Sequence, residues 1–243
     1  MEWLYQCVKV SEALKNHRRG RHISLPCGYG FGGGRLMPGS YANTLHNTRL
    51  IQQALDSSDI QALATYADRR LRAFFPKLHA LALNLDRQIV DVDNPQIKCA
   101  FKDCCYPACH LNLHNAATII HADYWNLVFL MCAVVCMGHF DHTRSVHFIA
   151  WSLGLVFEFP SGSAMYIPSA CVTHSNTPLA PHEHRSSMAF FVPAGLVQWY
   201  HNGFCSDKDF CEHASPKQLG DWKEYCANLW EVGLGLFQPA VAL

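Results

Sequence analysis

The central part of the chain, from about residue 98 to residue 200, alternates short apolar runs with glycine, proline, serine and asparagine. Examples of these runs are CHLNLH, VHFIAWSL, SAMYIP and SSMAFFV. Many short strands separated by turn residues are typical of a β-sandwich or a barrel-like fold. We therefore predict a β-rich core over residues 98–204, and this feature constrains the fold more than any other.

The regions on either side of this core read as helix. Over residues 44–97, the stretch from Ser58 to Gln61 fits a capping box, apolar residues follow at helical spacing, and Pro76 predicts a kink or a restart. Over residues 205–243, Ser215 is a good N-cap with Gln218 three positions later. Residues 1–43 form an N-terminal segment that ends in the glycine-rich stretch CGYGFGGGRLMPGSYAN. The fold class that we predict is α+β, in one domain over residues 1–243.

Composition limits the function classes. Half of the residues are hydrophobic, the formal net charge is zero, and we find no apolar run of membrane-spanning length and no secretory signal. The 12 cysteines follow no disulfide framework, which favours reduced thiols and an intracellular location. A formal net charge of zero does not by itself indicate a nucleic-acid partner, because proteins that bind nucleic acid usually have a basic surface. Two basic runs, KNHRRGRH at 15–22 and DRRLRAFFPKLH at 68–79, are either solvated faces or local contacts for a polyanion.

The segment TIIHADYWNLVF, residues 118–129, places His121 and Asp123 two positions apart in an apolar run. If the segment is a strand, both side chains point to the same face. They are then either a satisfied polar pair or two ligands of a metal. His174, in VTHSN, follows an apolar strand-like run and offers a third ligand. Two imidazoles and one carboxylate on one face of a metal are the arrangement of non-haem Fe(II) oxygenases.

An arginine and a serine follow the last of these residues. Arg185 opens the hydrophobic run RSSMAFFV, and Ser187 is expected on the same side of that strand. A buried guanidinium needs a carboxylate partner, and an Arg-X-Ser pair suits the C5 carboxylate of 2-oxoglutarate. A zinc hydrolase would need a general base beside the open position, and the sequence shows none.

At this point a family resemblance becomes specific. The stretches GYGFGGGRLMPG, HLNLH, HADYWNL, AWSLGLVFEFPSGSAMYIPSACVTHSN and RSSMAFFVPAGLVQW resemble, in order and near spacing, the TET/JBP-like oxygenases that fungi carry in expanded numbers beside transposons. The resemblance covers about residues 17–204. It implies a double-stranded β-helix core, Fe(II), and 2-oxoglutarate and O₂ as cosubstrates. Characterised members of that family oxidise methyl groups on DNA bases, on 5-methylcytosine and in some fungal cases on N6-methyladenine.

The resemblance also assigns roles by position. His121, Asp123 and His174 match the catalytic iron triad, and Arg185 and Ser187 match the 2-oxoglutarate site. Two further residues match asparagines that recur in the family. The resemblance assigns Asn112 to the cosubstrate site and Asn126 to the substrate site. Where the family usually has a Gly-Gly pair, this chain has Ser145 and Val146, which we expect to stiffen a turn on the substrate side.

The substrate implied is DNA with a methylated base, 5-methylcytosine before N6-methyladenine, everted from the base stack, in an enzyme located in the nucleus. We expect the glycine-rich loop to form the cavity wall through Tyr29, Phe31 and Arg35. The basic runs then supply phosphate contacts, through Arg18, Arg19 and Arg21 and through Arg69, Arg70 and Arg72. Two alternatives stay open: a 2-oxoglutarate hydroxylase acting on a protein or a small molecule, and a non-catalytic transposon-accessory binding protein.

Other clusters have simpler interpretations. Zinc could bind at Cys99, Cys104, Cys105 and Cys109, or at Cys205, Cys211, His213 and Cys226, but neither set has a standard zinc spacing. We therefore expect structural thiols at the first set. Trp151 and Trp199 are expected in the core.

Overall fold

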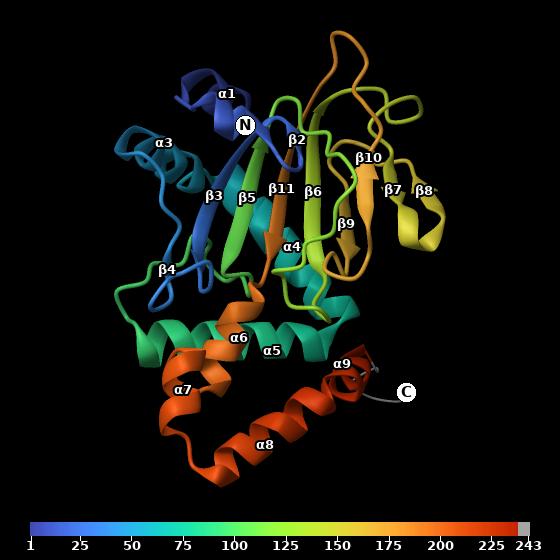
Figure 1. Cartoon of the computed structure of the whole chain (residues 1–243). Coiled ribbons are helices and arrows are strands. Elements are labelled where there is room, and N and C mark those ends of the chain that lie inside the picture. The colour runs from blue at the N-terminus through green and yellow to red at the C-terminus, as the bar shows by residue number, and fades with distance from the viewer. Residues whose placement is uncertain (238–243) are drawn as a thin grey trace.

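The computed structural model describes residues 1–237, apart from the side chain of residue 13. A six-stranded antiparallel sheet forms its centre, in the order β4-β3-β5-β11-β6-β9 (Figure 1). Its strands are β3 (Ile23–Gly30), β4 (Gly39–Ser40), β5 (Ala108–Leu113), β6 (Cys132–His139), β9 (Ala164–Ile167) and β11 (His184–Phe191). A smaller sheet, in the order β10-β7-β8, contains β7 (Phe148–Ala150), β8 (Leu155–Phe157) and β10 (His174–Asn176). Two sheets of this kind form a jelly-roll-like core.

Helices cover one face of the large sheet. The helical region contains α3 (Leu45–Leu55), α4 (Ser58–Phe74), α5 (Pro76–Arg87) and the π-helical turn η1 (Gln88–Asp93). In Figure 1, α4 runs behind the sheet and α5 runs below it. The buried residues of α4 recur at helical spacing and include Ala64, Ala67 and Leu71. The restart expected at Pro76 is confirmed, since α5 begins there. The N-cap of α4 differs from expectation, because it is Ser57 and no capping box forms at Ser58.

The remaining elements lie at the two ends of the chain. At the N-terminal end these are α1 (Glu2–Cys7), α2 (Glu12–Lys15) and a small hairpin of β1 (Asn16–His17) and β2 (Gly20–Arg21). After β11 follow α6 (Ala194–His201), α7 (Asp207–His213), α8 (Pro216–Ala227) and α9 (Leu229–Phe237). The capping box at Ser215 and Gln218 is present at the start of α8. Within the described residues, no helix is both long and apolar enough to cross a membrane.

Strand alternation separates two kinds of side chain on the large sheet. Leu111, Val135 and Met188 are completely buried in the hydrophobic core that the sheet shares with the helices. Their neighbours along the strands point to the other face, and this face carries Asn112, Arg185 and Ser187. The polar face therefore lies on the side of the sheet away from the helix layer.

The sheet extends further towards the N-terminus than the predicted core region of 98–204. Strand β3, from the N-terminal segment, pairs with β5 along its length, from Ile23 opposite Leu113 to Gly28 opposite Ala108. The expectation for Trp151 is wrong. This residue begins the short helical turn η2 (Trp151–Leu153), and its side chain is 49% exposed. Trp199 is buried, as expected.

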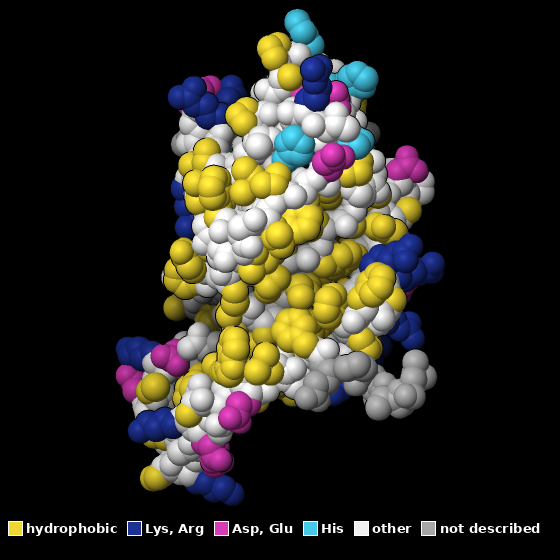
Figure 2. Space-filling model, turned by 90° about the vertical axis from the view of Figure 1, so that its right-hand side faces the viewer, with side chains coloured by type: hydrophobic (Ala, Val, Ile, Leu, Met, Phe, Trp, Pro, Cys, Tyr) yellow, Lys and Arg dark blue, Asp and Glu magenta, His cyan; other side chains and the backbone are white. Residues whose placement is uncertain are grey.

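The smaller sheet leaves apolar side chains exposed. All three residues of its edge strand β8 are exposed, and Leu153 in η2 is exposed as well. Figure 2 shows hydrophobic side chains spread across the face of the molecule to which β7 and β8 belong.

Candidate metal and cosubstrate site

The segment that carries His121 and Asp123 is an extended loop, and the strand expected there does not form. A single antiparallel bridge joins His121 to His174, at the start of β10. The two residues exchange backbone hydrogen bonds of 3.0 and 2.8 Å, and the backbone N–H of Asp123 donates to the carbonyl of Ser169 at 2.9 Å. The fold thus pins together two segments that lie far apart in the sequence.

These backbone contacts bring three candidate ligands together. The ligand atoms of His121, Asp123 and His174 all lie within 4.8 Å of one another. His121 Nδ1 donates to the carbonyl of Ile119 at 2.8 Å, and His174 Nδ1 donates to the carbonyl of Val172 at 2.7 Å. A carbonyl can only accept, so Nδ1 carries the proton in both rings and Nε2 keeps its lone pair. This is the state in which an imidazole binds a metal.

The electrostatics of the triad suit a divalent cation. Burial, followed by the neighbouring His174, lowers the pKa of His121 to about 4, so its ring is neutral at physiological pH. Asp123 is buried, and its Oδ1 accepts no well-aligned hydrogen bond in the described structure. Two imidazoles and a carboxylate fit Fe(II), whose oxygenase sites use these ligand types.

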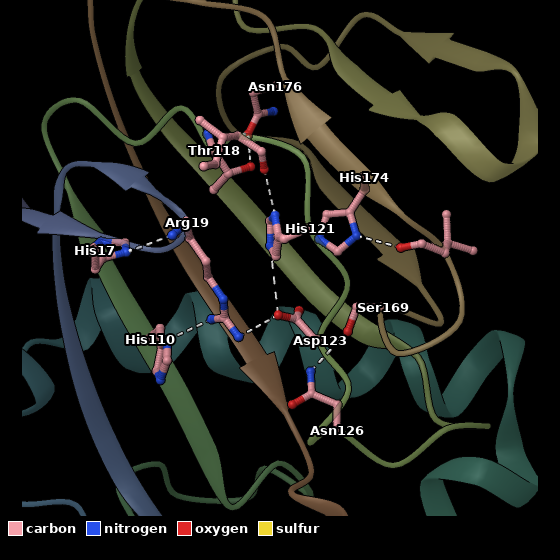
Figure 3. A network of polar contacts seen from close by, with 12 residues as sticks. His17, Arg19, His110, Thr118, His121, Asp123, Asn126, Ser169, His174 and Asn176 are labelled. Atoms are coloured by element: carbon pink, nitrogen blue, oxygen red, sulfur yellow. Dashed lines mark hydrogen bonds and ion pairs between the residues drawn. The ribbon is translucent and has the colours of Figure 1, made fainter.

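Arg19 lies in the candidate site, whereas the sequence predicts that it contacts DNA phosphate. Its side chain reaches from the β1–β2 turn into the site, as Figure 3 shows. Its Nη2 forms an ion pair with Asp123 Oδ1 at 2.5 Å, and its Nη1 lies 3.5 Å from His110 Nδ1. The guanidinium therefore balances the charge of Asp123 in the metal-free protein.

Arg185 lines the same narrow cavity as the triad. It is 2% exposed, donates to the carbonyl of Ala116, and has its guanidinium 5.4 Å from the ring centre of Phe159. No carboxylate of the described residues pairs with it, and its Nε has no partner. Burial lowers the pKa of Arg185 from its usual value. A buried guanidinium without a counter-charge is costly, and an anionic ligand would offset that cost.

Polar groups surround Arg185 in the cavity. Ser187 follows it on the same face of β11, and Asn112 lies opposite Ser187 on β5, with its amide donating to the Ser187 hydroxyl at 3.2 Å. The structure therefore brings together the five residues that the sequence assigned to iron and the C5 carboxylate, together with Asn112.

The predicted substrate residues are distributed differently. Tyr29 is wrong as a wall of the cavity, because it is completely buried on the helix-facing side of β3 and donates to Asp86 at 2.7 Å. Phe31 and Arg35 line a separate groove of about 610 Å³. Asn126 also borders that groove, but its amide donates to Ser169 at 2.9 Å, so it supports the segment that carries Asp123.

The second basic run cannot serve a base in this cavity. Arg69, Arg70 and Arg72 are exposed on α4, and α4 packs on the opposite face of the large sheet from the triad (Figure 1). Arg18 and Arg21 remain exposed on the β1–β2 hairpin, close to the candidate site. Only this hairpin can supply the phosphate contacts expected from the basic runs.

Neither cysteine set forms a metal site among the residues that the structure describes. Cys104, Cys105 and Cys109 are buried thiols, as expected, but Cys99 is exposed, so the expectation of a buried thiol is wrong for that residue. A different cluster joins Asp68, His79 and Cys105. Its acceptor Asp68 Oδ1 is already engaged by His79 Nε2 and by the backbone N–H of Cys105, both at 2.9 Å. We interpret this cluster as a buried tie between α4, α5 and the loop before β5.

The fold is a jelly-roll-like core of two antiparallel sheets, and its His-Asp-His cluster has the ligand types that non-haem Fe(II) oxygenases use. Among solved structures, the chain is similar to NgTET1 in complex with 5mC DNA, with a TM-score of 0.52 and 11% identity. That match covers 71% of this chain and 61% of NgTET1, so the chain spans less than two thirds of that protein.

A weaker similarity is to a 2OG-Fe(II) oxygenase family oxidoreductase from Burkholderia pseudomallei, with a TM-score of 0.40, 16% identity, and 78% of this chain and 76% of that protein covered. No protein-family model matches the sequence. A search of curated protein sequences finds no relative.

Proposed function

We propose that the protein is an Fe(II)- and 2-oxoglutarate-dependent dioxygenase that oxidises a methyl group on a DNA base, 5-methylcytosine first and N6-methyladenine second. The observation that supports this proposal most is one cavity that holds both a His-Asp-His triad and a buried arginine without a carboxylate partner. A metal needs the first, and a dicarboxylate cosubstrate needs the second.

The residues of the chain have distinct parts in this reaction. When bound, iron and 2-oxoglutarate would activate O₂, so that one oxygen atom converts a C–H bond to C–OH and the other enters succinate as 2-oxoglutarate loses CO₂. His121 and His174 present Nε2, because backbone carbonyls fix their Nδ1 protons. Arg185 and Ser187 hold the distal carboxylate, and the remaining walls exclude water from the cavity.

The proposal also specifies a substrate, which is DNA. This substrate is supported by the motifs shared with the TET/JBP-like family of fungal transposon neighbourhoods and by the similarity of the fold to that of a TET protein. A nuclear location follows from such a substrate. A target methyl group can reach the cavity only if its base leaves the stack, because the ligands lie inside the fold.

The test is nucleoside mass spectrometry after incubation with Fe(II), 2-oxoglutarate and DNA that carries either mark. We expect one mark to be converted, with succinate formed in step. His121→Ala and Asp123→Ala should abolish both products and metal binding but leave the fold intact, whereas His139→Ala, an exposed histidine outside the triad, is the matched control.

Two results would redirect the proposal. Near wild-type succinate formation by either triad variant would mean that the ligands are assigned wrongly. Brisk succinate formation that a protein or small-molecule extract stimulates, with neither mark lost from the DNA, would move the assignment to the hydroxylase alternative. The zero net charge of the chain is compatible with that alternative. Absence of any turnover would favour a non-catalytic binding protein.

A further inference from the structure

A rigid turn follows the ligand Asp123 directly. The backbone N–H of Asn126 donates to the carbonyl of Asp123 at 2.8 Å, which closes a four-residue turn with Tyr124 and Trp125 at its tip. Further hydrogen bonds fix the turn on both sides: Asp123 N–H to the Ser169 carbonyl at 2.9 Å, and Ala194 N–H to the Trp125 carbonyl at 2.9 Å. The backbone at the tip is therefore held by the same contacts that hold the ligand.

The side chains at this tip are mostly exposed to solvent. Tyr124 is 75% exposed and Trp125 is 72% exposed. Turn tips usually carry glycine, proline, asparagine, aspartate or serine, and large aromatic side chains exposed to water are a cost. Rigid, exposed aromatic residues are typical of surfaces that bind a partner. Their place in the sequence, directly after a metal ligand, puts this surface next to the segment that carries the triad, at the edge of the separate groove.

The charges around the turn indicate what kind of partner it fits. Tyr124 and Trp125 border the groove of about 610 Å³, whose walls, among the residues that the structure describes, contain one cationic residue, Arg35, and no acidic residue. On the other side of the triad, the backbone N–H of Ile119 donates to the carbonyl of Arg19 at 2.9 Å. This hydrogen bond ties the ligand segment to the hairpin that exposes Arg18 and Arg21. Aromatic side chains flanked by cations, without acids between them, suit a polyanion with stacking bases.

We propose that Tyr124 and Trp125 stack on the DNA bases next to the target and hold open the gap that the target base leaves when it enters the cavity. This inference rests on the proposed function and deepens it. The turn is rigid and adjoins Asp123, so a base stacked on Trp125 fixes its neighbour at a constant position relative to the ligands. Both residues are positioning residues. The cations of the hairpin hold the phosphates, and the aromatic turn holds the bases.

The experiment uses a DNA duplex with one methylated base and the fluorescent base 2-aminopurine opposite it. Unstacking of the opposite base raises its fluorescence, so the signal reports the gap directly. With the full chain, we expect binding to raise the fluorescence. Trp125→Ala should weaken binding about tenfold or more and remove the fluorescence rise, because base–aromatic stacking contributes that much to affinity. Trp125→Phe should restore most of both signals.

The matched control is Trp230→Ala. Trp230 is 73% exposed, nearly the same as Trp125, but it lies on α9 and is not among the residues that line the groove. This variant should bind DNA as the wild-type protein does. The dependence of binding on salt separates the two contact types. Trp125→Ala should keep the wild-type salt slope, whereas Arg18→Gln with Arg21→Gln should reduce it, because only the arginines release counterions.

Several outcomes would overturn the inference. If Trp125→Ala binds DNA with wild-type affinity and fluorescence while the wild-type protein converts the methylated base, the stacking role is wrong and the proposed function stands. If the wild-type protein forms succinate but binds no DNA, the DNA substrate itself is wrong. If Trp125→Ala loses Co²⁺ binding, measured by absorbance, the residue supports Asp123 structurally. If it abolishes self-association without changing DNA affinity, the turn is an interface between copies of this chain.

Discussion

At the scale of single residues, the site contains two arginines whose charges are balanced to different degrees. Asp123 is paired with Arg19, whereas Arg185 has no carboxylate partner. The two arginines therefore differ in what a ligand does to them. A metal held by the triad would take over from Arg19 as the counter-charge of Asp123, and an anionic cosubstrate would give Arg185 a counter-charge. Two predictions follow from this difference.

Arg185→Ala should raise the apparent KM for 2-oxoglutarate at least tenfold. A charge-assisted hydrogen bond contributes about 1.5 to 3 kcal/mol, and a bidentate contact to a carboxylate uses two of them. Arg185→Lys should rescue poorly, because a lysine keeps the charge but lacks the planar pair of donors. Succinate formation at increasing 2-oxoglutarate concentrations measures both variants. An unchanged KM in Arg185→Ala would mean that another residue anchors the cosubstrate.

Arg19→Gln should lower the melting temperature of the metal-free protein and increase the stabilisation that Mn²⁺ provides. Removal of one partner leaves Asp123 as an uncompensated buried charge, which costs about 3 to 5 kcal/mol in fully buried pairs. The cost here should be smaller, because 24% of the Arg19 side chain is exposed. Thermal unfolding with and without Mn²⁺ measures both effects. Equal metal-induced shifts in variant and wild type would show that Arg19 does not compete with the metal.

At the scale of elements, the sequence predicts most of what periodicity and capping control. The helices at 44–97, the restart at Pro76 and the capped helix at Ser215 all form where expected. The alternation of side chains along β3 also shows why Tyr29 fails as a site residue. Tyr29 lies on the same face of the strand as Leu25 and Cys27, and this face belongs to the core. Val146 lies at φ +48°, a region that favours glycine, so a glycine would adopt this backbone conformation with less strain than valine does.

Asn126→Ala should weaken metal binding by about tenfold or more, the range for residues that orient a ligand from outside the coordination sphere. The Asn126 amide bonds Ser169, whose carbonyl accepts from the Asp123 backbone. Loss of this bond loosens the turn on which Asp123 sits. Titration with Co²⁺ measures the effect, and Ser169→Ala should reproduce it because it removes the other partner. A higher KM for DNA with unchanged metal affinity would instead restore the substrate-binding role that the sequence suggested.

At the scale of the whole molecule, the cavity is assembled from distant parts of the chain. They include the β1–β2 turn, the loop that carries His121 and Asp123, and strands β5, β6, β7, β9, β10 and β11. Local patterns identify the ligands because they follow a fixed spacing. They cannot show that Arg19 turns inward while Arg18 and Arg21 stay exposed, since only tertiary packing decides which face of a short hairpin meets Asp123. For the same reason, the sequence could not place Arg69 behind the sheet.

The assembled cavity also buries histidines that should make the protein sensitive to acid. Burial, with smaller contributions from His17 and Arg185, lowers the pKa of His22 to about 3. Burial, followed by Arg19, lowers the pKa of His110 to about 4. In the unfolded chain both groups take up a proton near pH 6.5, whereas in the folded protein they stay neutral. Proton binding therefore does not affect the free energy of unfolding above pH 6.5. As the pH falls from 6.5 towards 4, the unfolded chain binds more protons than the folded protein, and the free energy of unfolding decreases.

Each of these two histidines should lower the free energy of unfolding by about 1.4 kcal/mol per pH unit over that interval. Urea unfolding at pH 7.5, 6.0 and 5.0 measures the slope. His22→Gln should reduce the slope, because glutamine does not titrate, whereas His213→Gln on the exposed surface of α7 is the matched control for losing one imidazole. Equal slopes for His22→Gln and wild type would show that the cavity admits protons and water freely. In that case it could not exclude water from the reaction that we propose.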